Sequence, residues 1–171
     1  MRPSSGDEAA GEGFWRFSLA LYARPGAAEA LIALQDRAGR DVNLILFALW
    51  LAVCRNRRLD AAGLVAAEAA ITPLNAAAVA PLRELRRQLK TAPNRNLQGL
   101  RRRILALELA AERLVQRRLA GLVPNAPDAL PEGDRLAAAE ANLALYLGDE
   151  VGSPEARLLC RVLANLIGAE C

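Results

Sequence analysis

The chain has 171 residues, of which 53% are hydrophobic and only 4% are aromatic, and its formal net charge is +3 at pH 7. Its 36 alanines and 31 leucines are strong helix formers, so the composition favours an all-helical protein with enough apolar material for one core. The chain has no histidine, which excludes Ser-His-Asp catalysis, Cys-His catalysis and histidine-based zinc sites.

The first third of the chain predicts a polar tail and three helices. The predicted elements are a disordered tail over 1–12, helices at about 14–22 and 27–37, and a helix at about 42–54. Gly39 suits the end of the second helix, and the Asp41 side chain is expected to cap the third. That third helix is apolar on every side but too short to span a bilayer, which requires about 20 residues. It therefore predicts a buried helix at the centre of the fold.

The rest of the chain predicts a helical hairpin, a linker and a final pair of helices, which Asp134 and Ser153 are expected to cap. Asp60 is expected to cap a fourth helix that ends near Ala70, and Thr72-Pro73 is expected to begin a fifth. The apolar stripe of the fifth helix consists of Leu74, Ala78, Leu82, Leu85 and Leu89. The stripe of the sixth helix, at about 97–119, has heptad spacing and consists of Leu97, Leu100, Ile104, Leu107, Ala111 and Leu114.

The predicted fold is all-α, a single compact helical domain of about seven to eight helices around the buried helix at 42–54. The expected layout is a disordered tail (1–12), a helical core domain (13–120) that includes a hairpin at about 73–119, a Pro/Gly-rich linker (121–134) and a C-terminal helical pair packed on the core (135–171).

Charge is distributed unevenly along the chain, with a basic middle and an acidic end. Eight cations and one anion lie between residues 83 and 103, and eight anions and three cations follow from residue 128. The three cysteines form no CxxC pair, so they are expected to be reduced thiols in a cytoplasmic protein, with Cys54 in the core.

A first candidate site combines aromatic and polar residues of the first 50 positions. Carboxylates and amides beside aromatics are typical of small-molecule pockets. The candidate ligand-binding residues are Trp15, Tyr22, Asp36, Asp41 and Asn43. The structural alternative is that the aromatics are core, Asp41 is only a helix cap and Asp36 pairs with Arg40 or Arg16. Asn43 is the hardest to dismiss, because a buried amide in an apolar helix needs a partner.

A second candidate site is a basic interaction face on the hairpin, formed by Arg83, Arg86, Arg87, Lys90 and Arg101. Three interpretations stay open: internal pairing or solvation, an acidic protein partner, and nucleic acid bound through phosphates. No aromatic residue interleaves with these cations, which disfavours single-strand binding by base stacking. Glu108 and Glu112 lie four residues apart but lack the histidines of a carboxylate metal site, so neither a metal nor a cofactor is expected.

Several segments together resemble a known family. They are FWRFSLALYARPGAAEALIALQDRAGRDVNLILFALWLA (14–52), PLRELRRQLK (81–90) and ELAAER (108–113), and they contain FWxFSL, QDxxGxDVN and PLRxxRRxLK in order. This pattern is similar to the signature of a bacterial family of small helical proteins known as a domain of unknown function. The resemblance covers about residues 13–118. It implies a small cytoplasmic all-α protein and transfers no catalytic residues.

The functional prediction is a non-enzymatic cytoplasmic interaction or accessory protein that binds a protein partner and no membrane. One alternative is nucleic-acid association through the basic region 83–103. The other is a small-ligand or enzymatic pocket among residues 15–43. Homodimerisation is also left open.

Overall fold

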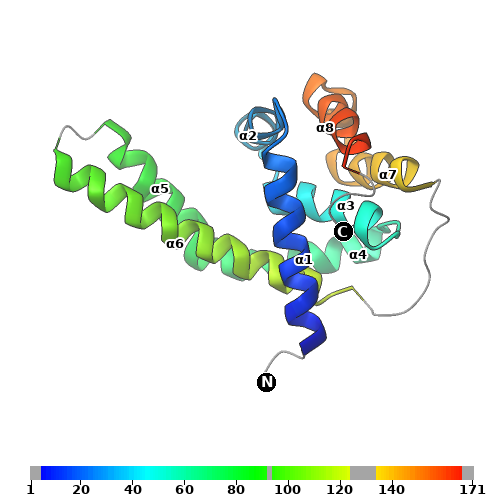
Figure 1. Ribbon diagram of the computed structural model, residues 1–171, viewed down its shortest axis with the longest axis horizontal. Helices are drawn as coiled ribbons and strands as arrows, with labels where there is room; N and C mark the ends of the chain where they lie inside the picture. The colour runs from blue at the N-terminus through cyan, green and yellow to red at the C-terminus, as the bar shows by residue number, and fades with distance from the viewer. Residues whose placement is uncertain (1–4, 92–93, 124–133, 167–171) are drawn as a thin grey trace.

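All regular structure is helical in the computed structural model, which describes residues 5–91, 94–123 and 134–166. Figure 1 shows a body of helices from which a hairpin, α5 and α6, projects far to one side. The elements in chain order are α1 (Ser5–Tyr22), α2 (Ala27–Ala38), α3 (Val42–Cys54), α4 (Ala61–Leu74), the π turn η1 (Asn75–Val79), α5 (Ala80–Gln88), the 3-10 turn η2 (Leu89–Thr91), α6 (Arg95–Ala120), α7 (Arg135–Leu147), the 3-10 turn η4 (Gly148–Gly152) and α8 (Pro154–Ala164). The predicted all-α class is confirmed.

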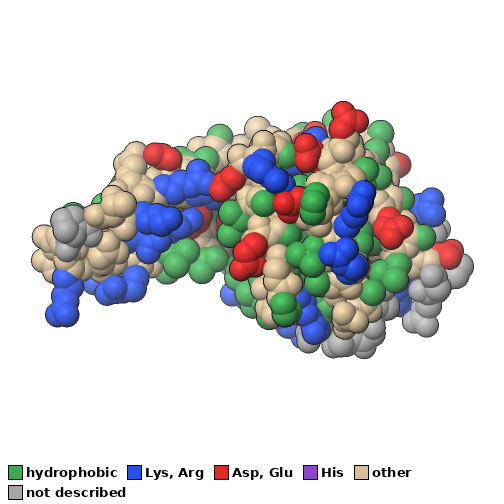
Figure 2. Space-filling model, turned by 90° about the horizontal axis from the view of Figure 1, so that it is seen from above, with side chains coloured by type: hydrophobic (Ala, Val, Ile, Leu, Met, Phe, Trp, Pro, Cys, Tyr) green, Lys and Arg blue, Asp and Glu red, His purple; other side chains and the backbone are tan. Residues whose placement is uncertain are grey.

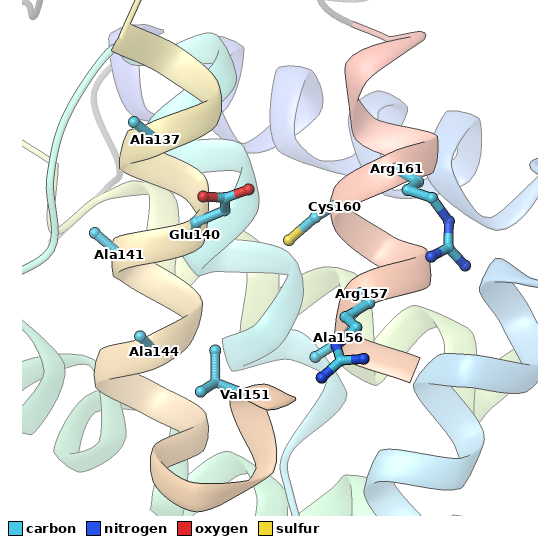
Figure 3. Close-up of a pocket in the computed structure, with 9 residues that line it drawn as sticks. All are labelled: Ala137, Glu140, Ala141, Ala144, Val151, Ala156, Arg157, Cys160 and Arg161. Atoms are coloured by element: carbon cyan, nitrogen blue, oxygen red, sulfur yellow. The ribbon is translucent and has the colours of Figure 1, made fainter. Parts of the chain in front are cut away.

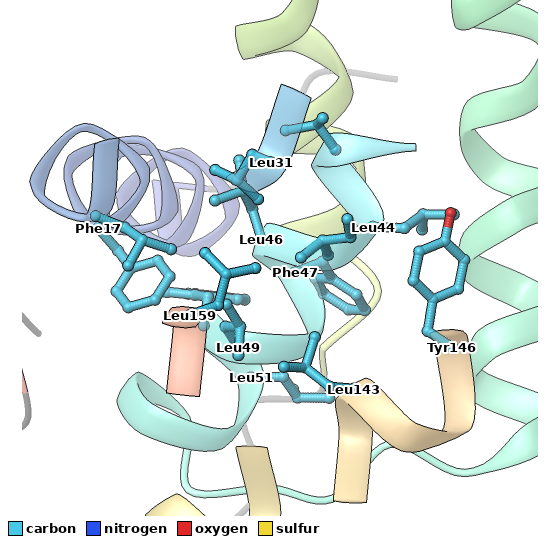
Figure 4. Close-up of a cluster of buried hydrophobic side chains, with 14 of the residues drawn as sticks. Phe17, Leu31, Leu44, Leu46, Phe47, Leu49, Leu51, Leu143, Tyr146 and Leu159 are labelled. Atoms are coloured by element: carbon cyan, nitrogen blue, oxygen red, sulfur yellow. The ribbon is translucent and has the colours of Figure 1, made fainter. Parts of the chain in front are cut away.

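Helix α3 lies at the centre of the body, as the uninterrupted apolar run predicts. Every residue from Val42 to Val53 is buried, and helices α1, α2, α6 and α7 all pack against α3. On one side the ring of Phe14 stacks on that of Trp50 with centroids 4.9 Å apart. Figure 4 shows the leucines and aromatics of α3 meeting side chains of its neighbours in one apolar cluster. Burial on all sides explains why this helix has no polar face.

A buried amide fastens α7 to the core. Asn142 is fully buried, and its Nδ2 donates to the carbonyl oxygens of Ala48, at 3.0 Å, and Arg57, at 3.2 Å. Its Oδ1 accepts from the backbone N–H of Leu59 at 2.7 Å. The Asn142 side chain thus binds the backbone in the middle of α3 and in the loop that follows this helix. No sequence motif pointed to this residue.

The predicted disordered tail is wrong for residues 5–12, because α1 begins at Ser5. The early turns of α1 pack on the last turns of α6. A Cβ atom at Gly11 would lie 3.0 Å from Arg117 Cγ, so the glycine lets the two helices approach closely. Glu12 forms an ion pair with Arg113, whose guanidinium lies 5.7 Å from the ring centroid of Trp15. This tertiary contact stabilises turns whose local composition predicts no helix.

The predicted helix boundary at Thr72-Pro73 is also wrong, because α4, η1 and α5 form one continuous helix. The Thr72 hydroxyl donates to the carbonyl of Glu68 at 2.7 Å inside the helix and caps nothing. Between Pro73 and Pro81 the hydrogen bonding changes to the π pattern, in which the Ala80 N–H donates to the Asn75 carbonyl. The proline at position 81, which has no N–H to donate, is accommodated directly after this turn.

This continuous helix, Ala61–Thr91, is the one described element that is long and apolar enough to cross a membrane, by length and composition alone. An 18-residue stretch of it has a mean hydropathy of 1.4, and 17% of that stretch is buried in the protein. The absence of membrane association therefore stays a prediction.

The remaining boundary predictions have mixed outcomes. The caps by Asp41, Asp60 and Ser153 are confirmed, since each side chain accepts a backbone N–H of its helix. Gly39 ends α2 with a left-handed φ of 64°, also as predicted. Asp134 makes no capping hydrogen bond. Most of the predicted linker, residues 124–133, and the hairpin residues 92–93 lie outside the described part of the chain.

One of the three cysteines expected to be reduced thiols differs from that expectation, one agrees with it, and Cys171 lies outside the described residues. Cys54 is disulfide-bonded, and Cys160 is a free, half-buried thiol.

Candidate functional site

A cavity of about 320 Å³ lies at the base of the hairpin, where α1, α2, α3, α5 and α6 meet. Its wall brings together three residues of the aromatic-polar prediction and two of the basic-face prediction. These five are Trp15, Tyr22, Asn43, Arg83 and Arg86. The other lining residues are Ser18, Leu19, Ile32, Gln35, Val42, Leu46, Leu105, Glu108, Leu109, Glu112 and Gln116. The two predicted sites thus share one cavity.

One wall of the cavity is a chain of three buried polar side chains. The Ser18 hydroxyl donates to Gln116 Oε1 at 3.2 Å, and Gln116 Nε2 donates to Asn43 Oδ1 at 3.0 Å. The same hydroxyl lies 3.0 Å from the Phe14 carbonyl, so its single proton serves two acceptors. All three side chains are less than 5% exposed. The Asn43 side chain therefore has a hydrogen-bond partner on α6, because the apolar side chains of α3 offer none.

A second wall is a cluster of two carboxylates and two guanidinium groups. Glu108 is almost fully buried, and its Oε1 accepts from Arg83 Nε at 3.1 Å while its Oε2 accepts from Arg86 Nε. Arg83 Nη2 also donates to Glu112 Oε1 at 2.7 Å. Glu108 thus occupies the seam between α5 and α6.

The two carboxylates of this cluster have opposite pKa shifts. Burial alone would raise the pKa of Glu108, but hydrogen bonds from Arg86 and Arg83 outweigh it and hold this pKa below its ordinary value. Burial raises the pKa of Glu112 by more than Arg83 lowers it, and Glu108 adds to the rise. The pKa of Tyr22 is raised to about 12, mainly by burial and to a smaller extent by the negative charge of Glu112, so its hydroxyl stays protonated. Glu112 is the group of this cavity that takes up a proton most readily.

Asp36 and Asp41, the other two candidate ligand residues, do not line the cavity. Asp36 is exposed and pairs with Arg87 at 2.9 Å, not with the expected Arg40 or Arg16. Asp41 caps α3, and its second oxygen accepts from Asn75 Nδ2 in the π turn at 2.5 Å. Both carboxylates therefore have structural partners.

The predicted basic face separates into a paired and an unpaired part. Arg83, Arg86 and Arg87 hold carboxylates, whereas Lys90 and Arg101 form no ion pair with any described residue. Three more cations near the hairpin tip, Arg95, Arg102 and Arg103, are likewise without ion pairs in that part of the chain. Figure 2 shows Lys and Arg side chains along the hairpin and at its outer end. The free positive charge lies toward the tip.

The predicted heptad stripe of α6 is buried only in part. Ile104 and Ala111 are buried, but Leu100, Leu107 and Leu114 are 45%, 58% and 51% exposed. Besides these two, the fold buries residues of α6 that are not part of the stripe, namely Glu108, Val115, Gln116, Leu119 and Ala120. The described helices cover only one side of α6, so the leucines on its other side stay about half exposed.

A wider groove lies between α7 and α8 and encloses about 630 Å³. Figure 3 shows its alanine lining and the Cys160 thiol, which points toward α7 and Glu140. Burial and the Glu140 charge raise the pKa of Cys160, so this thiol is not an activated nucleophile. The described residues contain no cluster of three or more potential metal ligands.

Comparison with known proteins identifies the family. Residues 13–119 match the model of a family described as Protein of unknown function (DUF2390). The chain belongs to DUF2390. The match confirms the resemblance found in the sequence. Neither the curated proteins nor the solved structures contain a match to the chain.

Within this DUF2390 chain, each of the three sequence motifs contributes to the cavity. FWxFSL supplies Trp15 and Ser18, QDxxGxDVN supplies Gln35 and Asn43, and PLRxxRRxLK supplies Arg83 and Arg86. The groove between α7 and α8 lies outside the matched residues.

Sequence reasoning missed Ser18 and Gln116. Ser18 carried no signal beyond its place beside aromatics. Gln116 stands one residue after the buried Val115, on the side of α6 that carries Glu112, and that spacing was available as a signal.

Proposed function

We propose that this DUF2390 protein is a non-catalytic interaction protein that binds an acidic amphipathic helix of a protein partner along the outer face of α6. The outer face of α6 is defined by Leu100, Leu107 and Leu114 together with Arg103 and Arg118. The observation that supports it most directly is an unburied leucine strip beside arginines that have no ion pair among the described residues.

The spacing of these residues places them on one side of the helix. The three leucines are seven residues apart, and a straight α-helix drifts by only about 20° per seven residues. Arg103 lies three residues after Leu100 and four before Leu107, so it borders the strip, as Arg118 does beyond Leu114. Fourteen residues of helix extend about 21 Å, or nearly four turns. This length suits a partner helix with leucine-like anchors at helical spacing and carboxylates along its edges.

The same features favour a protein partner over nucleic acid. Exposed leucines offer nothing to phosphates, and the described residues of the hairpin contain no aromatic side chain on which a base could stack. A second copy of this chain would place arginines beside arginines at the shared strip, which disfavours self-association there.

A synthetic probe tests the proposal directly. The probe is a fluorescently labelled amphipathic peptide with leucines at positions i, i+3, i+4 and i+7 and glutamates on both flanks. Fluorescence anisotropy should show binding to the wild-type protein that weakens as salt increases. Leu107→Glu, at the centre of the strip, should weaken binding at least about tenfold. Val65→Glu is the matched control, because Val65 is similarly exposed, at 64% against 58% for Leu107, but lies on α4; this variant should bind normally.

Three results would overturn the proposal. Equal binding by Leu107→Glu and Val65→Glu would show that the strip is not the contact. Tighter binding of a duplex or single-stranded oligonucleotide than of the peptide would favour the nucleic-acid alternative. Concentration-dependent dimerisation in sedimentation velocity that Leu107→Glu abolishes would assign the strip to a second copy of the chain.

A further inference from the structure

The Asn43 side chain has hydrogen-bonding capacity that the protein does not use. Asn43 is only 4% exposed, its Oδ1 accepts from Gln116, and its Nδ2 donates to no described residue. Nδ2 is also not among the fully enclosed atoms that lack a partner, and the residue lines the cavity. The Nδ2 group therefore remains accessible, and an acceptor that enters the cavity can take its hydrogen bonds.

The two arginines of the cavity also have unused donors. Arg83 donates through Nε and Nη2, and Arg86 donates through the same two nitrogens. Each guanidinium has five N–H groups, and Nη1 of both arginines donates to no described residue, so it can bind another oxygen. The protonated Tyr22 hydroxyl makes no hydrogen bond within the described structure and is a further donor. The polar part of the cavity therefore has a surplus of donors.

The rest of the cavity wall is apolar. Trp15, Leu19, Ile32, Leu105 and Leu109 form the side toward solvent, and Leu46 lies on the core side. The volume of about 320 Å³ is at the lower end of the range of small-molecule sites, about 300–1,000 Å³. The occupant must be small, with one end that accepts hydrogen bonds and one apolar end.

We infer that this cavity binds a small monocarboxylic acid, with the carboxylate toward Asn43, Arg83 and Arg86 and a short hydrocarbon portion against Trp15 and the leucines. The inference concerns residues distinct from the outer face of α6, so it does not depend on the proposed partner helix.

A bound carboxylate would change the charge balance of this cavity. Arg83 and Arg86 are already balanced by Glu108 and Glu112, so a bound carboxylate adds one uncompensated negative charge. The charged and titratable groups near Glu112 are Arg83 on α5, Tyr22 on α1, Asp41 at the start of α3 and Glu108 on the same helix. Of the two carboxylates in this cavity, Glu112 gains a proton more readily than Glu108. Protonation of Glu112 would cancel the extra negative charge of the bound carboxylate. Carboxylate binding should therefore take up a proton and tighten as the pH falls.

The test uses octanoate and octan-1-ol as a pair with the same chain length and different head groups. Isothermal titration calorimetry should show one octanoate per chain and at least about tenfold weaker binding of octan-1-ol. Octanoate should bind more tightly at pH 5.5 than at pH 8, and Glu112→Gln should abolish this pH dependence.

Two tryptophan substitutions locate the site. Leu109→Trp fills the cavity and should abolish octanoate binding, whereas Leu107→Trp, on the same helix but outside the cavity, should leave it unchanged. Circular dichroism confirms folding of each variant. If Leu109→Trp does not fold, Asn43→Leu replaces it and should weaken octanoate binding by at least tenfold.

Equal affinity for octanoate and octan-1-ol would overturn the inference, because the cavity would then recognise only hydrocarbon. Octanoate binding that survives Leu109→Trp or Asn43→Leu in a folded protein would also overturn the inference. The same holds if the wild-type protein shows no binding at 10 mM octanoate. Failure here leaves the peptide experiment with Leu107→Glu unaffected, so the two proposals are tested separately.

Discussion

Replacing Glu108 by glutamine tests whether an ion-pair cluster holds the hairpin together. The Glu108 side chain is 4% exposed and accepts hydrogen bonds from Arg83 and Arg86, which are 22% and 25% exposed. Glutamine keeps the size of the side chain but removes its charge, so two guanidinium groups then share Glu112 alone. Removing one partner of a buried ion pair costs about 3–5 kcal/mol. Because both arginines are partly hydrated, we expect a loss near the lower end, about 3 kcal/mol.

Urea unfolding followed by circular dichroism measures this loss as a lower midpoint with an unchanged slope. Glu84→Gln is the matched control, because Glu84 is exposed on α5 and forms no ion pair with a described residue, and it should change stability by less than about 0.5 kcal/mol. Replacing Glu108, Arg83 and Arg86 together by leucine should recover most of the loss, since apolar residues often substitute for a buried ion cluster. The reasoning is refuted if Glu108→Gln costs less than about 1 kcal/mol, or if the triple variant is less stable than the single one.

Three further predictions concern other parts of the molecule. Asn142→Leu removes the side-chain hydrogen bonds to the carbonyls of Ala48 and Arg57 and to the N–H of Leu59, and it should lower the free energy of unfolding by about 3 kcal/mol in urea; a loss under about 1 kcal/mol would contradict its anchoring role. The pKa of Glu112 is raised in the folded state, so the ionised form of Glu112 lowers the stability of the folded protein at high pH. This destabilisation disappears as the pH falls through the folded-state pKa toward the unfolded-state pKa of about 4.3. The stability of Glu112→Gln relative to wild type should therefore be most favourable near pH 8 and decline toward pH 4.5 in urea unfolding, and a constant difference would contradict the shift. Gly26 has a φ of +78°, and a Cβ there would lie 2.9 Å from Leu158 Cδ2, so Gly26→Ala should lower stability by about 1–2 kcal/mol, whereas Gly13→Ala, in open space on α1, should not.

The fold was predictable where local signals agree with the tertiary environment. The apolar run of α3 and the Asp41 cap are local, and both predictions hold. The first turns of α1 and the continuity of the helix through Thr72 depend on neighbours far along the chain. A polar N-terminal segment became helical because α6 packs against it, which no local pattern reveals.

The cavity was predictable in part. Trp15, Tyr22 and Asn43 were found because aromatic and amide residues stood out in an apolar context. Asp36 and Asp41 carried the same signal, but one pairs at the surface and the other caps a helix. The aromatic-polar cluster and the basic face looked like separate sites, because no local sequence pattern indicates that the start of α5 and helix α1 line the same cavity.

The π turn at 75–79 has a consequence for how the hairpin meets α6. In an uninterrupted α-helix, Leu82 and Leu85 would continue the side that carries Leu74 and Ala78, as their spacing suggests. One additional residue in a turn rotates everything beyond it by about 100°. Leu85 accordingly faces solvent, and Arg83 and Arg86 face Glu108.

The chain thus encodes two alternative seams for α5, one of leucines and one of arginines, and a single residue determines which of them is used. Deleting one of the alanines at 76–78 would rotate α5 back and exchange the polar cluster for an apolar contact. The length of this segment, more than the identity of its residues, decides whether charged groups meet at the base of the hairpin.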